Sequence, residues 1–166
     1  MKFELRHGRP EDAIEFAKLL NKSIKNKTAP FINTNRPLTL KDTKKYAKSI
    51  RKREILYFVA EVDNKVIAAV SAKFNKYRLA HNVSLGWAID ENHRGKGIGT
   101  KLLKYVCTEL KKIKRLKRLE CSIVSENKAS IKIAKRAGFK RAGILKNAFK
   151  VDNGRYHNLY IFEKLL

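Results

Sequence analysis

The sequence predicts an α/β fold, with helices packed on a mixed β-sheet. Apolar residues alternate in several short segments, which is the period of half-buried strands, and recur every three to four residues in others, which is the period of amphipathic helices. The two kinds of segment follow one another along the chain, with no repeat, low-complexity stretch or linker. Because 166 residues with 43% hydrophobic content suffice for one core and are few for two, we expect a single domain over residues 1–166.

The chain should open with a strand near residues 3–6 and a helix that begins at Pro10. Proline suits the first turn of a helix, where its missing N–H leaves no hydrogen bond unmade, and the two acidic residues after it complement the helix dipole. The apolar residues that follow have mostly helical spacing. This helix should end before Pro30.

A loop is expected from Thr28 to Pro37, where proline, asparagine and threonine are frequent. Thr39 then N-caps a second helix that extends to about Arg51. Two β-rich runs, residues 55–60 and 66–74, lie on either side of an Asp-Asn turn. We expect them to form a hairpin.

The middle of the chain should contain a strand, a glycine-rich loop and a long helix in that order. Residues 83–89 alternate between larger and smaller side chains, as in a strand with two different faces. The loop Arg94 to Gly99 follows, and the helix begins inside it, because Ile98 and the apolar residues up to Ile113 recur at steps of three and four. The next strand covers about residues 118–124.

The last quarter should form one helix and one hairpin. Asn127 is a candidate N-cap for the helix, and Gly138 should end it. Two β-rich runs, at residues 144–150 and 156–162, lie on either side of Asn153-Gly154. Asn-Gly is the strongest short hairpin signal, because both residues tolerate a positive φ.

The chain is strongly basic, with 39 lysine and arginine residues against 15 aspartate and glutamate residues and a formal charge of +24. Such a field speeds the approach of any anion, so nucleic acid, an acidic membrane and a phosphate-rich cofactor all remain open as partners. The densest basic run, residues 111–118, contains apolar residues at regular spacing. This spacing favours a solvated face over a polyanion contact.

Cysteine content and hydropathy indicate the cellular setting. Cys107 and Cys121 are too few for a disulfide scaffold and lie in no metal-binding pattern, so we expect no metal and a reducing, cytoplasmic setting. The first six residues are charged, unlike a signal peptide, and no run of eighteen apolar residues occurs. The sequence therefore predicts a cytoplasmic protein that contacts no membrane.

The loop Arg94-Gly95-Lys96-Gly97-Ile98-Gly99 indicates a pyrophosphate site. The first N–H groups of a helix have no internal partner and point at a ligand, and glycines let the backbone approach an anion closely. A P-loop is excluded, because no Gly-Lys-Ser or Gly-Lys-Thr occurs in the chain. A dinucleotide fingerprint is disfavoured, because the glycine it needs falls at Thr100 or Leu102.

At these residues the chain resembles the GNAT superfamily of acetyl-CoA-dependent N-acetyltransferases. The superfamily's signature, [Q/R]-x-x-G-x-[G/A] between the fourth strand and the third helix, is matched by Arg94, Gly97 and Gly99. Asn127, 33 residues after Arg94, resembles the family's N-x-x-[AS] helix start, and Gly138-Phe139 resembles its G-F ending. The resemblance implies a mixed, mostly antiparallel sheet of about seven strands with about four helices on both faces.

The resemblance also implies which groups hold acetyl-CoA, the expected co-substrate. The backbone of residues 87–89 would pair with the pantetheine arm, the loop would hold the pyrophosphate, and Asn127 would contact the arm near the thioester. A plain helix cap is an equally good interpretation of Asn127, and the two roles are compatible. The implied cofactor-binding residues are Trp87, Ala88, Ile89, Arg94, Gly95, Lys96, Gly97, Ile98, Gly99, Thr100 and Asn127.

The sequence departs from the family where a general acid and a general base are usual. The tyrosine that many members place seven residues after the asparagine is Ala134 here, and the positions of the usual glutamate are Ser84 and Ser122. Glu120 is the nearest substitute, because strand alternation puts it on the same face as Ser122, although a surface glutamate is the commoner interpretation. His81 is a second candidate, because an imidazole can take a proton near neutral pH, although a loop histidine is more often merely exposed.

The acceptor is expected to be a primary amine of a peptide or protein N-terminus, or of a free amino acid. Residues 143–146 and 154–157 resemble ribosomal-protein N-terminal (alanine) acetyltransferases and amino-acid N-acetyltransferases. The loop at 28–37 and the hairpin at 152–154 would frame the acceptor, and neither carries the acid cluster that would suit a polyamine or aminoglycoside. The rival hypothesis is a basic module that retains the fold and contacts RNA or ribosome with little or no turnover. In either case we expect a monomer or a homodimer, and the basic surface leaves a contact with ribosome or another polyanion open.

Overall fold

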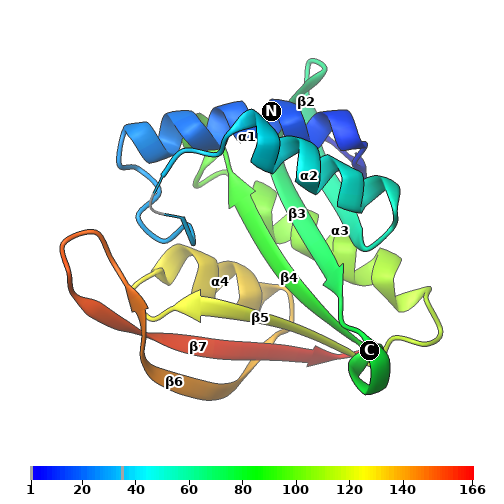
Figure 1. Cartoon of the computed structure of the whole chain (residues 1–166). Helices are drawn as coiled ribbons and strands as arrows, with labels where there is room; N and C mark the ends of the chain where they lie inside the picture. Colours follow the sequence, from blue (N-terminus) through cyan, green and yellow to red (C-terminus); the bar gives the residue numbers. More distant parts are fainter. Residues whose placement is uncertain (1, 35) are drawn as a thin grey trace.

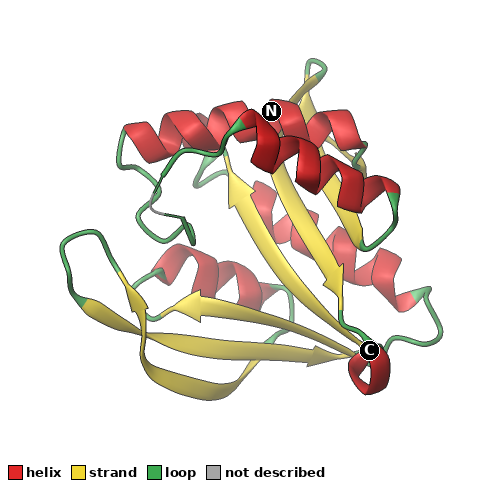
Figure 2. Cartoon of the chain, in the orientation of Figure 1, coloured by secondary structure: helices red, strands yellow, loops and turns green. Residues whose placement is uncertain are grey.

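The computed structural model describes residues 2–34 and 36–166, so the expectations at Met1 and Asn35 lie outside the described residues. Seven strands and four α-helices follow one another in the order that the sequence predicts over this part of the chain, with short 3₁₀ turns η1 and η2 on either side of β4 (Figure 1, Figure 2). The elements are β1 Glu4–His7, α1 Pro10–Lys25, α2 Leu40–Arg51, β2 Ile55–Val62, β3 Lys65–Phe74, η1 Tyr77–Leu79, β4 Asn82–Ile89, η2 Glu91–His93, α3 Ile98–Lys111, β5 Arg118–Val124, α4 Lys128–Arg136, β6 Lys140–Lys150 and β7 Tyr156–Leu165.

One sheet contains all these strands, in the order β1-β2-β3-β4-β5-β7-β6. Every neighbouring pair is antiparallel except β4 and β5, which are parallel. This pair is short, since only Asn82–Ser84 of β4 aligns with Arg118–Glu120 of β5. Beyond it the two strands diverge, while β4 stays paired with β3 and β5 with β7 (Figure 1).

The sheet buries apolar side chains on both faces. Alternation along β2 sends Phe58 and Ala60 into a core with α3 and α4, and sends Tyr57 and Val59 into a second core with α1 and α2. Figure 1 shows α1 and α2 in front of the sheet and α3 behind it. Because β2 is covered on both sides, its sequence is a continuous apolar run.

The structure departs from the sequence-based boundaries in two places. β6 begins at Lys140 rather than near residue 144, because it is an exposed edge strand whose pairing with β7 has two irregularities, and these break the alternation that marks a strand. α3 ends at Lys111, so Ile113 packs against the core from the turn that follows the helix. The N–H of Ile113 donates to the carbonyl of Leu110.

The tight two-residue turn expected at Asn153-Gly154 is found instead at Asp63-Asn64. Asp63 and Asn64 both have positive φ, of 47° and 59°, as in a tight two-residue turn between β2 and β3. At the β6–β7 connection only Gly154 has a positive φ, of 82°, while the Asn153 side chain accepts a hydrogen bond from the N–H of Arg155. The hairpin predicted at Asn153-Gly154 is therefore present, with a longer loop than a two-residue turn.

A buried ion pair fixes the start of α1. Asp12 accepts hydrogen bonds from Arg6 of β1, at 2.7 and 3.0 Å, and from the N–H of Arg9 at 2.6 Å. Burial alone would raise the pKa of Asp12, but the hydrogen bonds and charge of Arg6 and the Arg9 N–H outweigh burial and leave the pKa lowered. The next turn of this helix, with Ala13 and Phe16, lines the cavity described below.

We predict that Asp12→Asn lowers the free energy of unfolding by about 2 kcal/mol at pH 7, because Arg6 loses a charged partner in a buried setting. The lowered pKa means that the unfolded chain binds more protons in acid, so the contribution of Asp12 is complete at neutral pH and is lost as the pH falls below about 4. Urea unfolding at pH 7 and pH 3 checks this. The difference between wild type and variant should shrink in acid, whereas Asp63→Asn, in an exposed turn that asparagine also tolerates, should change little at either pH.

Candidate active site

The divergence of β4 from β5 leaves one backbone edge of β4 open. The backbone carbonyl of His81 accepts hydrogen bonds from the N–H groups of Lys117 and Arg118, on the β5 side. The N–H of Asp90 donates to the carbonyl of Ile67 in β3, on the other side. Peptide groups of a strand face alternate sides, so those of residues 85, 87 and 89 face the opening and that of residue 88 faces β3. An extended ligand can therefore pair with Trp87 and Ile89, while Ala88 can meet it only through its side chain.

The glycine-rich loop lies at the end of this open edge. The first helical bond of α3 runs from the N–H of Lys101 to the carbonyl of Gly97, at 3.1 Å. Within the described residues, no backbone carbonyl or side chain accepts a hydrogen bond from the six N–H groups of residues 95–100. These amides stand at the positive end of the α3 dipole, which is the arrangement that binds phosphate.

The three loop glycines are required for different reasons. Gly95 and Gly97 have φ of 76° and 78°, which side-chain-bearing residues rarely adopt, and a Cβ on either would enter open space. A Cβ on Gly99 would instead lie 2.5 Å from Ile89 Cδ1 and 2.8 Å from Ile133 Cδ1. Gly99 therefore allows the first turn of α3 to pack closely on β4 and α4, and so sets where the free amides lie.

The side chains of the loop are mostly occupied with the protein itself. Arg94 donates to the carbonyl of Ile89 at 3.2 Å and to that of Thr28 at 2.7 Å, so it ties the loop after α1 to the glycine-rich loop. Lys96 donates to the carbonyl of Asn92 at 3.0 Å. Ile98 is buried in the core, so that only its backbone faces outward, and Thr100 is half-buried.

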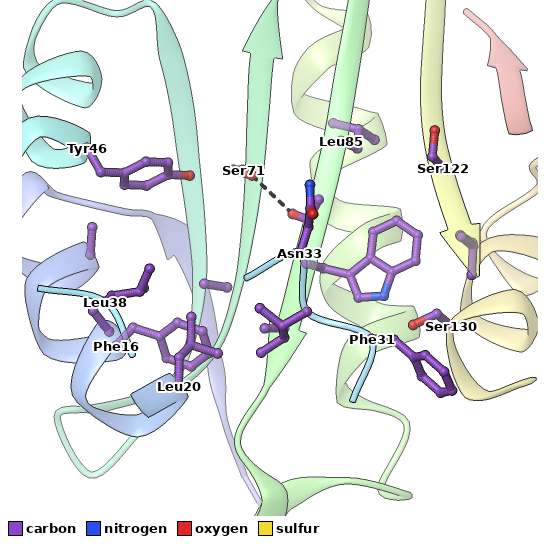
Figure 3. Close-up of a pocket in the computed structure, with 18 of the residues that line it drawn as sticks. Phe16, Leu20, Phe31, Asn33, Leu38, Tyr46, Ser71, Leu85, Ser122 and Ser130 are labelled. Atoms are coloured by element: carbon purple, nitrogen blue, oxygen red, sulfur yellow. Dashed lines mark hydrogen bonds between the residues drawn. The ribbon is translucent and has the colours of Figure 1, made fainter. Parts of the chain in front are cut away.

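A cavity of about 560 Å³ lies where β4 and β5 separate (Figure 3). Trp87, Ala88 and Asn127 are part of its lining, together with Ser122 of β5. The opposite side is formed by α1 and α2, as the positions of Phe16, Leu20, Leu38 and Tyr46 in Figure 3 show. The cavity thus connects the open edge of β4 with the face covered by α1 and α2.

Asn127 caps α4 and also lines the cavity. Its Oδ1 atom accepts a hydrogen bond from the N–H of Ser130 at 3.1 Å, which caps α4. The side chain also lines the cavity, and its amide nitrogen makes no hydrogen bond with any described residue. The cap therefore fixes the side chain while a donor remains for a ligand.

The two candidate catalytic residues lie outside the cavity lining. Glu120 accepts a hydrogen bond from Ser84 at 3.1 Å and pairs with Arg118, which also bonds Glu163 at 2.8 Å. His81 precedes β4 at the end where β4 and β5 are paired, far from the glycine-rich loop. The structure therefore does not bring Glu120, His81 and the glycine-rich loop together.

Ala134, Ser84 and Ser122, which occupy the positions of the family's usual acid and base, lie in different surroundings. Ala134 is fully buried against the core on the inner side of α4. The Ser84 hydroxyl donates a hydrogen bond to Glu120, whereas Ser122 lines the cavity. Of these three positions only Ser122 presents a polar group to a ligand.

The sequence did not identify the residues of α1 and α2 that line the cavity. Phe16 and Tyr46 have the spacing of core residues, and no local signal tells a core side chain from one beside an opening. Burial raises the pKa of Tyr46, in spite of a hydrogen bond with Ser71 that lowers it, so its hydroxyl stays protonated. Asp42 accepts hydrogen bonds from Arg36 and Thr39, and these lower its pKa.

The loop expected to frame an acceptor contributes to the lining of the cavity. Phe31, Ile32 and Asn33 line the cavity. The turn at residues 152–154 is not in its lining, although Phe149 at the end of β6 is. The described part of the loop therefore covers the cavity, and the hairpin contributes through its strand.

The described residues offer neither a reactive thiol nor a metal site. Cys107 and Cys121 are buried and not bonded to each other, and burial raises the pKa of Cys121 to about 12, which leaves it no nucleophile. Residues 2–34 and 36–166 contain no group of three or more His, Cys, Asp or Glu placed to hold a metal ion. None of their helices has the length and apolar character needed to cross a membrane.

Comparison with known proteins assigns the family. The model of the acetyltransferase (GNAT) domain matches residues 2–140. A probable N-acetyltransferase, YjcK of Bacillus subtilis, is 28% identical over 110 residues, which are 64% of this chain and 60% of that protein. An N-alpha-acetyltransferase of Sulfurisphaera tokodaii is 24% identical over 122 residues, which are 67% of this chain and 72% of the relative.

Solved structures agree with this assignment. The crystal structure of a ribosomal-protein-alanine N-acetyltransferase from Brucella melitensis superimposes with a TM-score of 0.84 at 25% identity, covering 98% of this chain and 99% of the other. The mixed seven-stranded sheet with helices on both faces, expected from the resemblance, is therefore confirmed. The family model, the relatives and the fold agree with the amides of residues 95–100 and the open edge of β4: the chain belongs to the acetyltransferase (GNAT) family, whose co-substrate is acetyl-CoA.

Proposed function

We propose that this chain transfers the acetyl group of acetyl-CoA to a primary amine, most specifically the α-amine of a peptide or protein N-terminus or of a free amino acid. The observation that carries the proposal is the continuous path from the six free amides of residues 95–100, along the open edge of β4, to the cavity. A diphosphate, an amide-bearing arm and a thioester need these three features in this order. Asn127 supplies a donor where the path enters the cavity.

The chemistry requires little from side chains. The neutral amine attacks the thioester carbonyl carbon, the bond between carbon and sulfur breaks, the thiolate takes up a proton, and the ammonium loses one to give the amide. An acyl donor that is already activated reacts quickly when an amine is held beside it, because binding supplies a high effective molarity. Asp42 is the only carboxylate in the described lining of the cavity, and it is bound to Arg36.

The lack of a free base favours an α-amine over a lysine side chain. The α-amine of a peptide has a pKa of roughly 7.7–8.0 and a lysine side chain about 10.4, so near neutral pH the neutral fraction of the peptide α-amine is more than a hundredfold larger. Two relatives support the same class of acceptor by their names, the N-alpha-acetyltransferase of Sulfurisphaera tokodaii and the ribosomal-protein-alanine N-acetyltransferase of Brucella melitensis. For this chain, we propose the same class of acceptor, an α-amine.

We also propose that a basic segment of the surface contacts a polyanion such as the ribosome. No aspartate or glutamate occurs between Glu126 and Asp152, a segment that contains α4 and the exposed edge strand β6. A ribosome or RNA that meets this segment would bring an acceptor to the cavity. The segment's basic residues are Lys128, Lys132, Lys135, Arg136, Lys140, Arg141, Lys146 and Lys150.

We predict that Gly97→Ala weakens acetyl-CoA binding about tenfold, or about 1.4 kcal/mol, because alanine disfavours the left-handed backbone that aims the loop amides. Calorimetric titration measures the dissociation constant, and circular dichroism checks the fold. Gly143→Ala is the matched control, because Gly143 lies in β6 and a Cβ there meets nothing within 4 Å. Equal affinity of both variants and the wild type would place the diphosphate elsewhere.

We predict that kcat/KM for a peptide with a free N-terminus rises about tenfold per pH unit below the pKa of its amine and levels off above it, near pH 8. Thiol release from acetyl-CoA gives the rate. Glu120→Gln should leave the profile unchanged, since Glu120 is bound to Arg118 outside the cavity lining. Loss of the pH dependence in this variant would make Glu120 the base. If the protein binds acetyl-CoA but releases no thiol with any acceptor, the basic binding module is favoured.

A further inference from the structure

On the basis of the proposed function, we propose that the acceptor is a peptide N-terminus whose first residue has a large apolar side chain, such as leucine, methionine or phenylalanine. Free amino acids are then poor acceptors. The inference rests on the composition of the cavity on the side of α1 and α2 and on the charges missing from its described lining.

The α1 and α2 side of the cavity is apolar. Phe16, Leu20 and Leu38 face it, as Figure 3 shows, with the ring of Tyr46 above them. Small residues on the same side, Ala13, Ala17 and Ala69, leave room between the helices and β3. A side chain that enters here from an amine near β4 exchanges water for apolar contacts, which favours a large apolar group.

The lining also lacks a cation. Although the chain carries a charge of +24, no lysine, arginine or histidine is found in the lining of the cavity over the described residues. A free amino acid bears its carboxylate one carbon atom from the amine, so attack on the thioester would bring that carboxylate inside. Burying an unpaired carboxylate is strongly unfavourable. Asp42, the one carboxylate in the described lining, is paired with Arg36 and offers an incoming carboxylate no partner.

A peptide avoids this penalty and finds partners. Its first residue carries a neutral amide in place of the carboxylate, and hydroxyl and amide side chains are available near the middle of the cavity. Ser71 and Asn33 lie there in Figure 3, between the apolar side and β4. Ser71 at present donates to the carbonyl of Gly86 at 3.3 Å, a long bond that a peptide group can replace.

The test compares acceptors on the unmodified protein. Peptides that differ only in their first residue, Leu, Met, Phe, Ala, Ser or Gly, are assayed by thiol release, together with the pair leucine and leucinamide. We expect kcat/KM to be about ten- to a hundredfold higher for the Leu, Met and Phe peptides than for the Ala peptide. Leucinamide should exceed leucine by at least tenfold at equal concentrations of neutral amine.

Two variants test the location of the pocket. Ala17→Leu fills it, so the ratio of kcat/KM for the Leu peptide over that for the Ala peptide should fall about tenfold. Leu20→Ala removes apolar contacts without adding bulk and should lower the same ratio even if the first variant folds poorly. Leu79→Ala, at an exposed residue outside the cavity lining, is the control and should keep the ratio. The affinity for acetyl-CoA reports on the integrity of all three.

The outcomes separate the two proposals. If no amine in the panel is acetylated although acetyl-CoA binds, the proposed function fails. If peptides are acetylated but Ala, Ser or Gly peptides are preferred, or leucine equals leucinamide, the function stands and the apolar acceptor pocket is refuted. If the preference for Leu is present but Ala17→Leu and Leu20→Ala both leave it unchanged, the pocket does not lie between α1 and α2.

Discussion

The separation of β4 from β5 after three paired residues is the constraint on which the rest of the site depends. Each strand is held by its other neighbour, β4 by β3 and β5 by β7, so both sides of the opening belong to the sheet although the edges that face each other are unpaired. The open edge of β4 ends where α3 begins, and Gly99 lets that helix pack against Ile89 of the same strand. One strand therefore sets the positions of both the extended edge and the anion site. Without the divergence, β5 would use the β4 backbone groups that a pantetheine arm requires.

This arrangement leaves polar backbone groups unsatisfied in the protein alone. The first amides of a helix have no partner inside the helix, so six consecutive free amides at residues 95–100, of which residues 98–100 are buried or half-buried, indicate a ligand or ordered solvent. Gly95 and Gly97 adopt left-handed backbone in the same loop, a conformation that glycine takes readily and other residues rarely do. Deviations of this kind gather at functional sites, where binding compensates for them. Elsewhere in the chain, Arg6, Asp12 and Glu61 form a fully paired network.

The sequence predicted local features well and non-local ones poorly. Helix starts, strands and the glycine-rich loop were identifiable because proline, N-cap residues, glycine and apolar periodicity act over a few residues, as at Pro10 and Thr39. The environment of Glu120 was not identifiable, because it depends on β7 lying beside β5 and bringing Glu163 to Arg118. Strand alternation placed Glu120 on the right face but gave no indication of how far along the strand the cavity extends. For the same reason Phe16 and Tyr46 were indistinguishable from core residues.

The contrast between the charge of the chain and that of its cavity separates two kinds of selection. A net charge of +24 acts over a distance of about 10 Å at moderate salt, so it speeds the arrival of any anion, including a nucleotide cofactor or an acidic macromolecule. It does not distinguish one acceptor from another, because no basic side chain enters the described lining of the cavity. Choice of the amine must then come from short-range terms, namely shape, burial of apolar area and the absence of a counter-charge. A basic exterior and a cavity whose described lining holds no basic side chain are compatible, because the first governs the rate of encounter and the second governs which bound amine reaches the thioester.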